Sequence, residues 1–235
     1  MGSLIQYKIL ISNILQYINN ILLHEFYIKI HTFVQDDLIF IKKGIAMSKL
    51  TELKKHLRRG RVYRRTDLTK WSKSVDRHLD MLLEDGTLKK LSQGLYYYPK
   101  ITAFGDSPPK EDQLVRSFLK DDRFLLTSPN TYNRLGIGTT QLYNKRTVYN
   151  HKRHGEFKLG TRIFDFRMKA HFPKQLTPEF LLVDLVNNLD ALGEDKQLIL
   201  KNVLDKAKNM NTKKLIKSIS AYGSIKAKKV FEPLL

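Results

Sequence analysis

Three short helix patterns and one hairpin pattern, all within residues 47–100, restrict the fold of this chain more than any other feature. The first pattern covers residues 47–58 and ends at Gly60, with leucines at positions 50, 53 and 57, the spacing of one helical face. The second covers residues 66–71 and begins at Thr66, a residue type that caps helices. Two short helices are therefore expected before residue 72.

A third helix is expected over residues 74–86, capped by Ser72 or Ser74 and closed by Gly86. At 100° per residue, one face carries Val75, Leu79, Leu82 and Leu83. The opposite face carries Lys73, Ser74, Arg77, Asp80, Met81 and Glu84. This helix is therefore predicted to bury one side and leave a mixed polar side free.

Residues 87–99 follow as two short strands around Ser92-Gln93-Gly94, and Pro99 ends the second strand. Three short helices followed by a hairpin are typical of a winged helix–turn–helix. In that arrangement the third helix enters the DNA major groove and the hairpin lies along the backbone or minor groove. We therefore expect a DNA-binding domain over residues 47–100, with a protein-contact module as the alternative use of the same fold.

The predicted DNA contacts fall into three groups. Lys73, Ser74 and Arg77 lie near the exposed start of the third helix, where Arg or Lys can donate to guanine O6 and N7. The residues flanking that helix, placed for phosphates, are Arg64, Arg65 and Lys70, and those on the wing are Lys89, Lys90 and Gln93. Trp71 and His78 are expected to be structural, as a helix-junction anchor and a core-edge residue.

The charge of the chain supports a polyanionic partner. The net charge is +19, and residues 47–100 hold 14 basic against 6 acidic residues. There is no cysteine, which excludes a disulfide scaffold, a cysteine-ligated zinc finger, an iron–sulfur protein and a thiol nucleophile.

Residues 1–46 differ from the rest, because 11 of the 46 are isoleucine and the segment holds only 4 basic residues. Polar residues interrupt the apolar run, so neither a membrane span nor a signal peptide is expected. Three interpretations stay open: an amphipathic helix covering a core or partner, an interfacial membrane anchor, or an extension outside the native protein. We favour the extension, since Met47 resembles a fresh start and stretches rich in Ile, Asn, Tyr and Lys are typical of translated AT-rich DNA.

The segment after this extension resembles a known family. The matching residues are the leucine-rich end of the third helix, Glu84-Asp85-Gly86, Leu88, Leu91, Gly94-Leu95-Tyr96 and Pro99, after the entry 62-VYRRTDL. They resemble the N-terminal domain of AbiEi-type antitoxins, the regulator half of bacterial AbiE-like (type IV) toxin–antitoxin pairs. The likeness covers residues 47–100 strongly and 101–235 more weakly.

This resemblance implies a cytoplasmic repressor that binds inverted repeats in its own promoter, with two protomers on one site. It also implies a C-terminal domain needed for antitoxin action, and a nucleotidyltransferase-like toxin as partner. The residues that carry the likeness mostly determine the fold, so they do not name the bases read.

Residues 101–109 contain three of the chain's prolines and glycines together with Ser and Asp, which predicts a linker. Residues 110–235 are predicted to form a mixed α/β domain with a small antiparallel sheet and a helical C-terminal part. Helices are expected over 110–121, 131–136, 177–192, 195–209 and 212–223, and strands near 124–128, 146–151 and 161–169 with a turn over 151–156. The fold class is therefore α+β.

The segment 143–158 is basic and aromatic, which suits either a second nucleic-acid or partner surface or a solvated basic loop. The residues of this second surface are Lys145, Arg146, Lys152 and Arg153. We expect no catalytic residue, metal or cofactor, since His151 and His154 lack a third ligand pattern and Gly136-Ile137-Gly138 lacks a nucleotide-binding context. The leading interpretation is a DNA-binding antitoxin repressor. The alternatives are an orphan winged-helix regulator, a protein-interaction module, or a nucleic-acid-processing enzyme.

Overall fold

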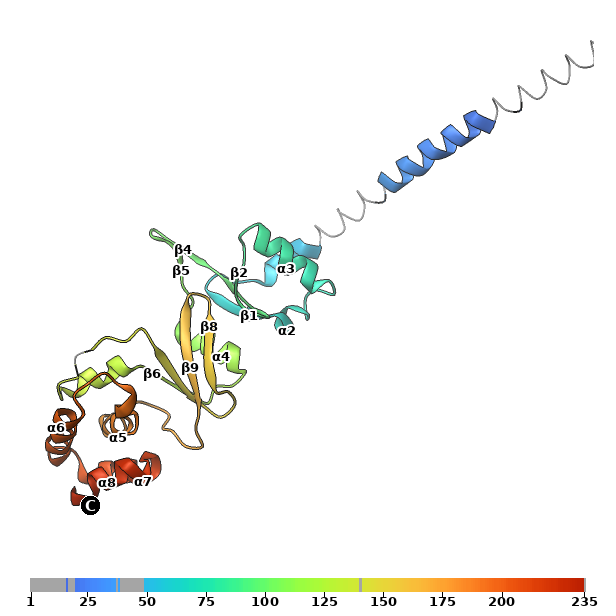
Figure 1. Cartoon of the computed structure of the whole chain (residues 1–235). Helices are drawn as coiled ribbons and strands as arrows, with labels where there is room; N and C mark the ends of the chain where they lie inside the picture. The colour runs from blue at the N-terminus through green and yellow to red at the C-terminus, as the bar shows by residue number, and fades with distance from the viewer. Residues whose placement is uncertain (1–15, 17–19, 37, 39–48, 140, 235) are drawn as a thin grey trace, which may run out of the picture. The chain divides into compact units, whose positions relative to one another are not determined.

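The computed structural model describes residues 16, 20–36, 38, 49–139 and 141–234, and it divides into two compact units, residues 1–56 and 57–235 (Figure 1). In the first unit, residues 20–36 are helical and exposed along their whole length, and residues 49–56 form a second helix. Leu50 and Leu53 are buried while positions 51, 52 and 54–56 are exposed, which confirms the amphipathic pattern expected there. The other residues of the N-terminal extension, and Met47, lie outside the described part of the chain.

The second unit starts with a three-stranded sheet and two helices. Strand β1 (Arg61–Arg64) is followed by α2 (Arg65–Leu68), α3 (Val75–Glu84), β2 (Lys89–Ser92) and β3 (Leu95–Tyr98). The sheet has the order β1-β3-β2 with both pairs antiparallel. The predicted hairpin and third helix are confirmed, and the second helix is shorter than predicted because it ends at Leu68.

Strand β1 was not predicted from the sequence. Its four residues are too few to show an alternation, and Val62 and Tyr63 are both buried. Its hydrogen-bonding partner β3 lies more than thirty residues further along the chain, with Arg61 opposite Tyr98 and Arg64 opposite Leu95. Pairing at that sequence separation leaves no local signal.

The predicted linker, residues 101–109, is mostly a second hairpin and not an irregular segment. Strands β4 (Lys100–Thr102) and β5 (Gly105–Ser107) pair antiparallel, and Gly105 has a φ of 95°, which a side chain would disfavour. The Thr102 hydroxyl donates to the Gly105 carbonyl at 2.7 Å and closes the turn. Figure 1 shows this hairpin standing away from the neighbouring strands.

The following sheet is mixed rather than antiparallel. Its strands β6 (Phe124–Thr127), β7 (Arg146–Asn150), β8 (Gly155–Leu159) and β9 (Arg162–Met168) have the order β6-β7-β9-β8. Strands β7 and β9 are parallel, since β8 begins at the end of the expected turn, at Gly155, and β9 lies between β8 and β7. The short run 155–159 showed no strand pattern of its own, because three of its five residues are Gly, Glu and Lys.

One hydrophobic core joins the two sheets. Helix α4 (Glu111–Leu119) contributes Leu114, Val115 and Leu119, which cluster with Val62 and Tyr97 of the first sheet. Phe164 and Phe166 of β9 complete the same cluster and are fully buried. The sequence boundary expected near residue 100 therefore has no matching break in the hydrophobic core.

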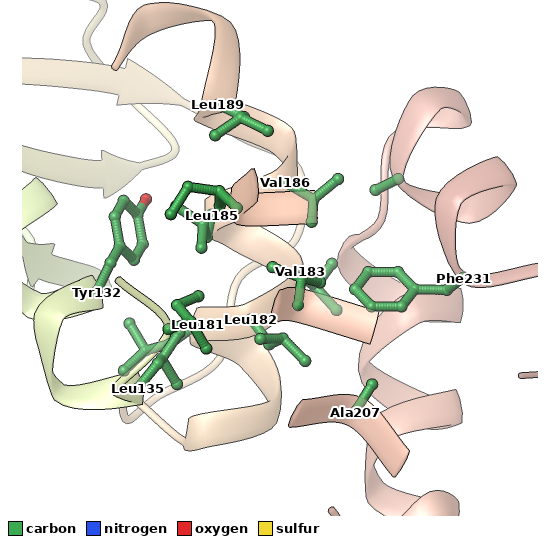
Figure 2. Packing of buried hydrophobic residues seen from close by; sticks show 14 of the residues in the cluster. Tyr132, Leu135, Leu181, Leu182, Val183, Leu185, Val186, Leu189, Ala207 and Phe231 are labelled. Atoms are coloured by element: carbon green, nitrogen blue, oxygen red, sulfur yellow. The ribbon is translucent and has the colours of Figure 1, made fainter. Parts of the chain in front are cut away.

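The C-terminal part is helical, as predicted. It contains α5 (Pro178–Asn188), α6 (Lys196–Lys208), α7 (Thr212–Tyr222) and α8 (Ile225–Phe231), and of these α8 was not expected. Short 3₁₀ segments are η1 (Pro129–Leu135), between β6 and β7, and η2 (Leu189–Ala191) and η3 (Glu232–Leu234) in the helical part. The Thr177 hydroxyl accepts from the Phe180 amide and caps α5. Seven consecutive α5 residues are buried, and Figure 2 shows Val183 facing the ring of Phe231 in this core.

Candidate nucleic-acid interface

Helix α3 buries one face and presents the other, as its hydrophobic pattern predicts. Val75, Leu79 and Leu82 are buried, while Lys73, Ser74, Arg77, Asp80 and Glu84 are exposed and Met81 is half-buried. This amphipathic arrangement follows from apolar residues spaced three or four positions apart. The free face starts in the first turn of the helix.

Two buried polar residues hold the start of α3. The Ser72 hydroxyl lies 2.9 Å from Nδ1 of His78 and accepts from the Ser74 amide at 3.1 Å. Both side chains are buried, so His78 is structural, as expected. Ser72, and not Ser74, therefore makes the side-chain contacts at this helix start. Trp71 is 37% exposed and so lies outside the buried core, which leaves its predicted role as a helix-junction anchor a prediction.

The exposed start of α3 carries cations without an acidic partner. Within residues 49–139 and 141–234, neither Lys73 nor Arg77 makes an ion pair, and the same holds for Lys90 on β2. Burial opposes ionisation of Asp67, but hydrogen bonds from Arg64 and, to a smaller extent, the nearby charge of Lys70 lower the pKa of that carboxyl. An unpaired guanidinium or ammonium on an exposed helix face keeps all its donors available to a base edge or phosphate.

Two of the predicted phosphate contacts are bound within the protein instead. Arg65 makes two hydrogen bonds to the Asp76 carboxylate, both of 2.6 Å, and joins the start of α2 to the first turn of α3. Arg64 binds Asp67 through Nε at 3.0 Å and Nη2 at 2.8 Å. The hydrogen bond from Arg65 lowers the pKa of Asp76, so this carboxylate stays ionised. Both arginines therefore hold α2 and α3 through these carboxylates, and their donors are already engaged inside the protein.

The wing residues divide in the same way. Lys89 Nζ lies 2.8 Å from the Asp106 carboxylate of β5, while Gln93 is exposed in the β2–β3 turn. The Arg65 amide donates to the Gly94 carbonyl at 2.9 Å, which places this turn beside the start of α2. Lys90 and Gln93 are thus the wing side chains available to a ligand.

Three further exposed cations lie in or shortly before strands β1 and β4, and none of them is among the predicted DNA contacts. Arg58, Arg61 and Lys100 are exposed, and no ion pair involves them within the described residues. Arg59 lies over the Tyr98 ring at 5.0 Å. The run Arg58-Arg59-Gly60-Arg61 carries this charge in the sequence as well as ending a helix.

The second basic segment contrasts with α3, because each predicted contact in it has a partner inside the protein. Lys145 pairs with Glu156, Arg146 with Glu111 at 3.0 Å, and Lys152 with Asp121 at 3.1 Å. The Arg153 guanidinium lies 4.5 Å from the centre of the Phe118 ring. Hydrogen bonds from Arg123 and Lys152 hold the pKa of Asp121 well below its ordinary value.

A buried polar cluster lies in the C-terminal half and was not expected. The Tyr132 and Tyr149 hydroxyls each donate to Asp184 at 2.8 Å, and Lys169 Nζ lies 3.4 Å from the same carboxylate. Asp184 is fully buried, and Asn188 donates its amide to both hydroxyls. Burial, followed by the charge of Asp184, raises the pKa of both tyrosines, so both stay protonated donors. The cluster connects η1, β7 and α5 and is fully hydrogen-bonded.

The described part of the chain shows neither a grouped set of metal ligands nor an apolar helix of membrane-spanning length. No group of three or more His, Cys, Asp or Glu residues there is arranged to hold a metal ion. His151 stacks on Phe172 with 4.7 Å between ring centres. None of the described helices is long and apolar enough to cross a membrane.

Comparison with known proteins gives a family and a fold. The pattern of the family described as "Family of unknown function (DUF6088)" matches residues 30–220, and so begins upstream of Met47. The crystal structure of the RV2827C protein from Mycobacterium tuberculosis is similar with a TM-score of 0.50 and 17% identity, covering 74% of this chain and 71% of that one. No curated protein matches the chain. At this identity the structural likeness concerns the fold alone.

Proposed function

The chain belongs to the DUF6088 family, whose function is unknown, and from the segment 49–98 we propose that it binds double-stranded DNA through a winged helix–turn–helix. The elements follow one another as helix 49–56, β1, α2, α3, β2 and β3, with β3 in the middle of the sheet. In a winged helix the third helix reads the major groove and the hairpin after it contacts the backbone or minor groove.

The observation that carries the proposal is the distribution of ion pairs around α3. Acidic residues of this region bind Arg64 and Arg65, whereas Lys73 and Arg77 are exposed and unpaired among the described residues. These two cations and Ser74 lie in or beside the first turn of the helix, the part that contacts base edges in helix–turn–helix proteins. Arg77 is the proposed base reader, because an arginine can donate two hydrogen bonds to guanine.

The backbone contacts of the proposal are Lys70, Lys90 and Gln93, with Arg64, Arg65 and Lys89 in a supporting role. The last three hold α2, α3 and the hairpin in register through Asp67, Asp76 and Asp106. Phosphate contacts of this kind give affinity and register but carry no sequence information.

We extend the proposal to the biological role through the resemblance to AbiEi-type antitoxins. The chain then represses its own operon by binding inverted repeats, two protomers to one site, and acts as antitoxin to a nucleotidyltransferase-like toxin encoded nearby. No catalytic chemistry is assigned to it. A reading frame for such a toxin directly beside this gene supports the antitoxin role, and its absence favours an orphan regulator.

The DNA test uses the full chain, a duplex from upstream of its own gene and a random duplex of equal length. Fluorescence anisotropy is measured for both across a salt series. We expect tighter binding to the upstream duplex and an affinity that falls steeply with salt, because binding releases counterions. Equal affinity for both duplexes at every salt concentration contradicts specific repression, and no binding to either contradicts DNA recognition.

Two single variants separate the roles of α3 and the wing. Arg77→Ala is expected to weaken binding to the upstream duplex by about tenfold or more and to reduce its advantage over random DNA. Lys90→Ala is expected to weaken both complexes alike and to lower the salt slope by about one. Glu84→Gln, on the exposed face of the same helix, serves as the control for altering α3 itself.

A protein-interaction role is the second candidate, and the β4–β5 hairpin favours it. Ile101 is 63% exposed and Phe104 fully exposed at the end of this projecting element. Exposed apolar residues on a projecting hairpin are typical of a protein contact. Phe104→Ser distinguishes the candidates, since it leaves DNA binding unchanged and weakens only a complex with a protein.

A further inference from the structure

A cavity of about 470 Å³ lies between the β1-β3-β2 sheet and the β6-β7-β9-β8 sheet, within residues 57–235. Its walls are β2 and β3, the Ser107-Pro108-Pro109 segment, helix α4 and the β8–β9 turn at Gly160. The floor is apolar, since Leu91, Tyr97, Leu114 and Leu159 line it. Small-molecule sites are mostly apolar clefts of about 300–1,000 Å³ with a few polar groups.

The walls of this cavity are fixed by contacts between segments far apart in the sequence. The Gly160 amide donates to the Leu91 carbonyl at 2.7 Å, which ties the β8–β9 turn to the edge strand β2. The Tyr97 hydroxyl donates to the Ser107 carbonyl at 2.9 Å and holds the proline segment in place. A ligand would therefore enter a site that is already formed, so little ordering of the protein opposes binding.

The rim of the cavity carries more positive than negative charge. Lys89, Lys90 and Arg162 line it together with Asp106. Lys89 contacts Asp106 at 2.8 Å and Arg162 contacts Glu111 at 3.0 Å, whereas Lys90 makes no ion pair among the described residues. Glu111 is shared with Arg146, also at 3.0 Å, so one carboxylate faces two guanidinium groups. An arginine that shares its carboxylate keeps donors for a further anion.

From the apolar floor and the cationic rim we propose that this cavity binds a small amphipathic anion, a molecule with an apolar body and one carboxylate or phosphate group. The body occupies the space over Leu91, Tyr97 and Leu159, and the charged group lies at Arg162. Because its walls come from β2 and from the β8–β9 turn, the occupant contacts the proposed wing and the second sheet together. The site stands on this geometry and does not depend on DNA binding.

The test measures octanoate binding to the full chain without DNA by isothermal titration calorimetry, with octanol as the uncharged probe. Wild-type protein is expected to bind octanoate saturably and more tightly than octanol. Arg162→Gln is expected to weaken octanoate binding by about fivefold, the effect of one partly exposed charge contact, and to leave octanol binding unchanged.

Arg146→Gln is the matched control, because Arg146 makes the same contact with Glu111 but does not line the cavity. It is expected to bind octanoate within about twofold of wild type. Thr161→Phe places a ring from an exposed position into the cavity and is expected to abolish binding of both probes. Circular dichroism confirms that each variant is folded.

Three results would overturn the proposal. Absence of saturable binding by either probe removes the site. Equal affinity for octanoate and octanol removes the anion preference. Equal losses in Arg162→Gln and Arg146→Gln, or full binding by Thr161→Phe, place the ligand elsewhere on the molecule.

Discussion

The α3 region and the segment 143–158 are both basic in sequence, yet their cations differ in what they contact. On α3, Lys73 and Arg77 are exposed without an ion pair among the described residues. In the second segment, Lys145, Arg146 and Lys152 each bind a carboxylate, and Arg153 lies on an aromatic ring. Net charge attracts a polyanion, but a cation without an internal partner keeps all its hydrogen-bond donors for the contact itself.

Asp184 is fully buried and has all its partners inside the protein, so its loss is expected to lower stability more than any other change proposed below. Asp184→Ala leaves two buried hydroxyls and Lys169 without their acceptor, which should lower the free energy of unfolding by about 3–5 kcal/mol. Urea denaturation followed by circular dichroism measures this. Asp190→Ala removes an exposed carboxylate and should lower the free energy of unfolding far less. Equal losses in the two variants would show that burial of the cluster has no special role.

A pair of double variants tests the contrast between the two basic segments directly. Lys73→Ala with Arg77→Ala is expected to weaken binding to the upstream duplex by at least about tenfold at moderate salt. Lys145→Ala with Lys152→Ala removes the same formal charge and should change that affinity by less than about threefold. Anisotropy titrations of all three proteins decide it. A comparable loss in the second double variant would restore 143–158 as a nucleic-acid surface.

Releasing a paired arginine sharpens the comparison in the opposite direction. Asp76→Asn breaks the contact with Arg65 and frees a guanidinium beside the first turn of α3. DNA binding should become tighter, and the salt slope steeper by about one phosphate contact. Glu84→Gln also removes one negative charge from α3, but among the described residues no arginine is paired with Glu84, so none is released. If both variants change the slope alike, charge alone and not the release of Arg65 determines it.

The smallest expected effect concerns pH. Hydrogen bonds from Lys226 and Lys196 lower the pKa of Asp190 to about 2. Because the folded pKa is below the ordinary value, the stabilisation is fully present above about pH 4 and is lost as pH falls toward 2. The difference in melting temperature between wild type and Asp190→Asn should therefore shrink between about pH 4 and pH 2. A difference that grows with acidity would contradict the assigned direction.

Helices were predicted better than strands, and the residues show why. Apolar residues repeat every three or four positions in α3 and in α5, so a short stretch of sequence is enough to predict each helix. Strand β1 has only four residues, and its partner β3 lies more than thirty residues further along the chain. Strand β8 pairs with the adjacent β9, but Gly, Glu and Lys among its five residues hide the strand pattern. The parallel pairing of β7 and β9 follows from where β8 inserts, which no local pattern contains.

For the candidate site, the free face of α3 and its charged residues follow from the sequence, because helical periodicity places them on one side. Which cations stay unpaired depends on the folded chain. Arg65 and Asp76 are 11 residues apart, Arg146 and Glu111 are 35 apart, and the cavity beside Gly160 needs two sheets. Ion pairs and cavities depend on distances of a few ångströms between segments that only the folded chain brings together.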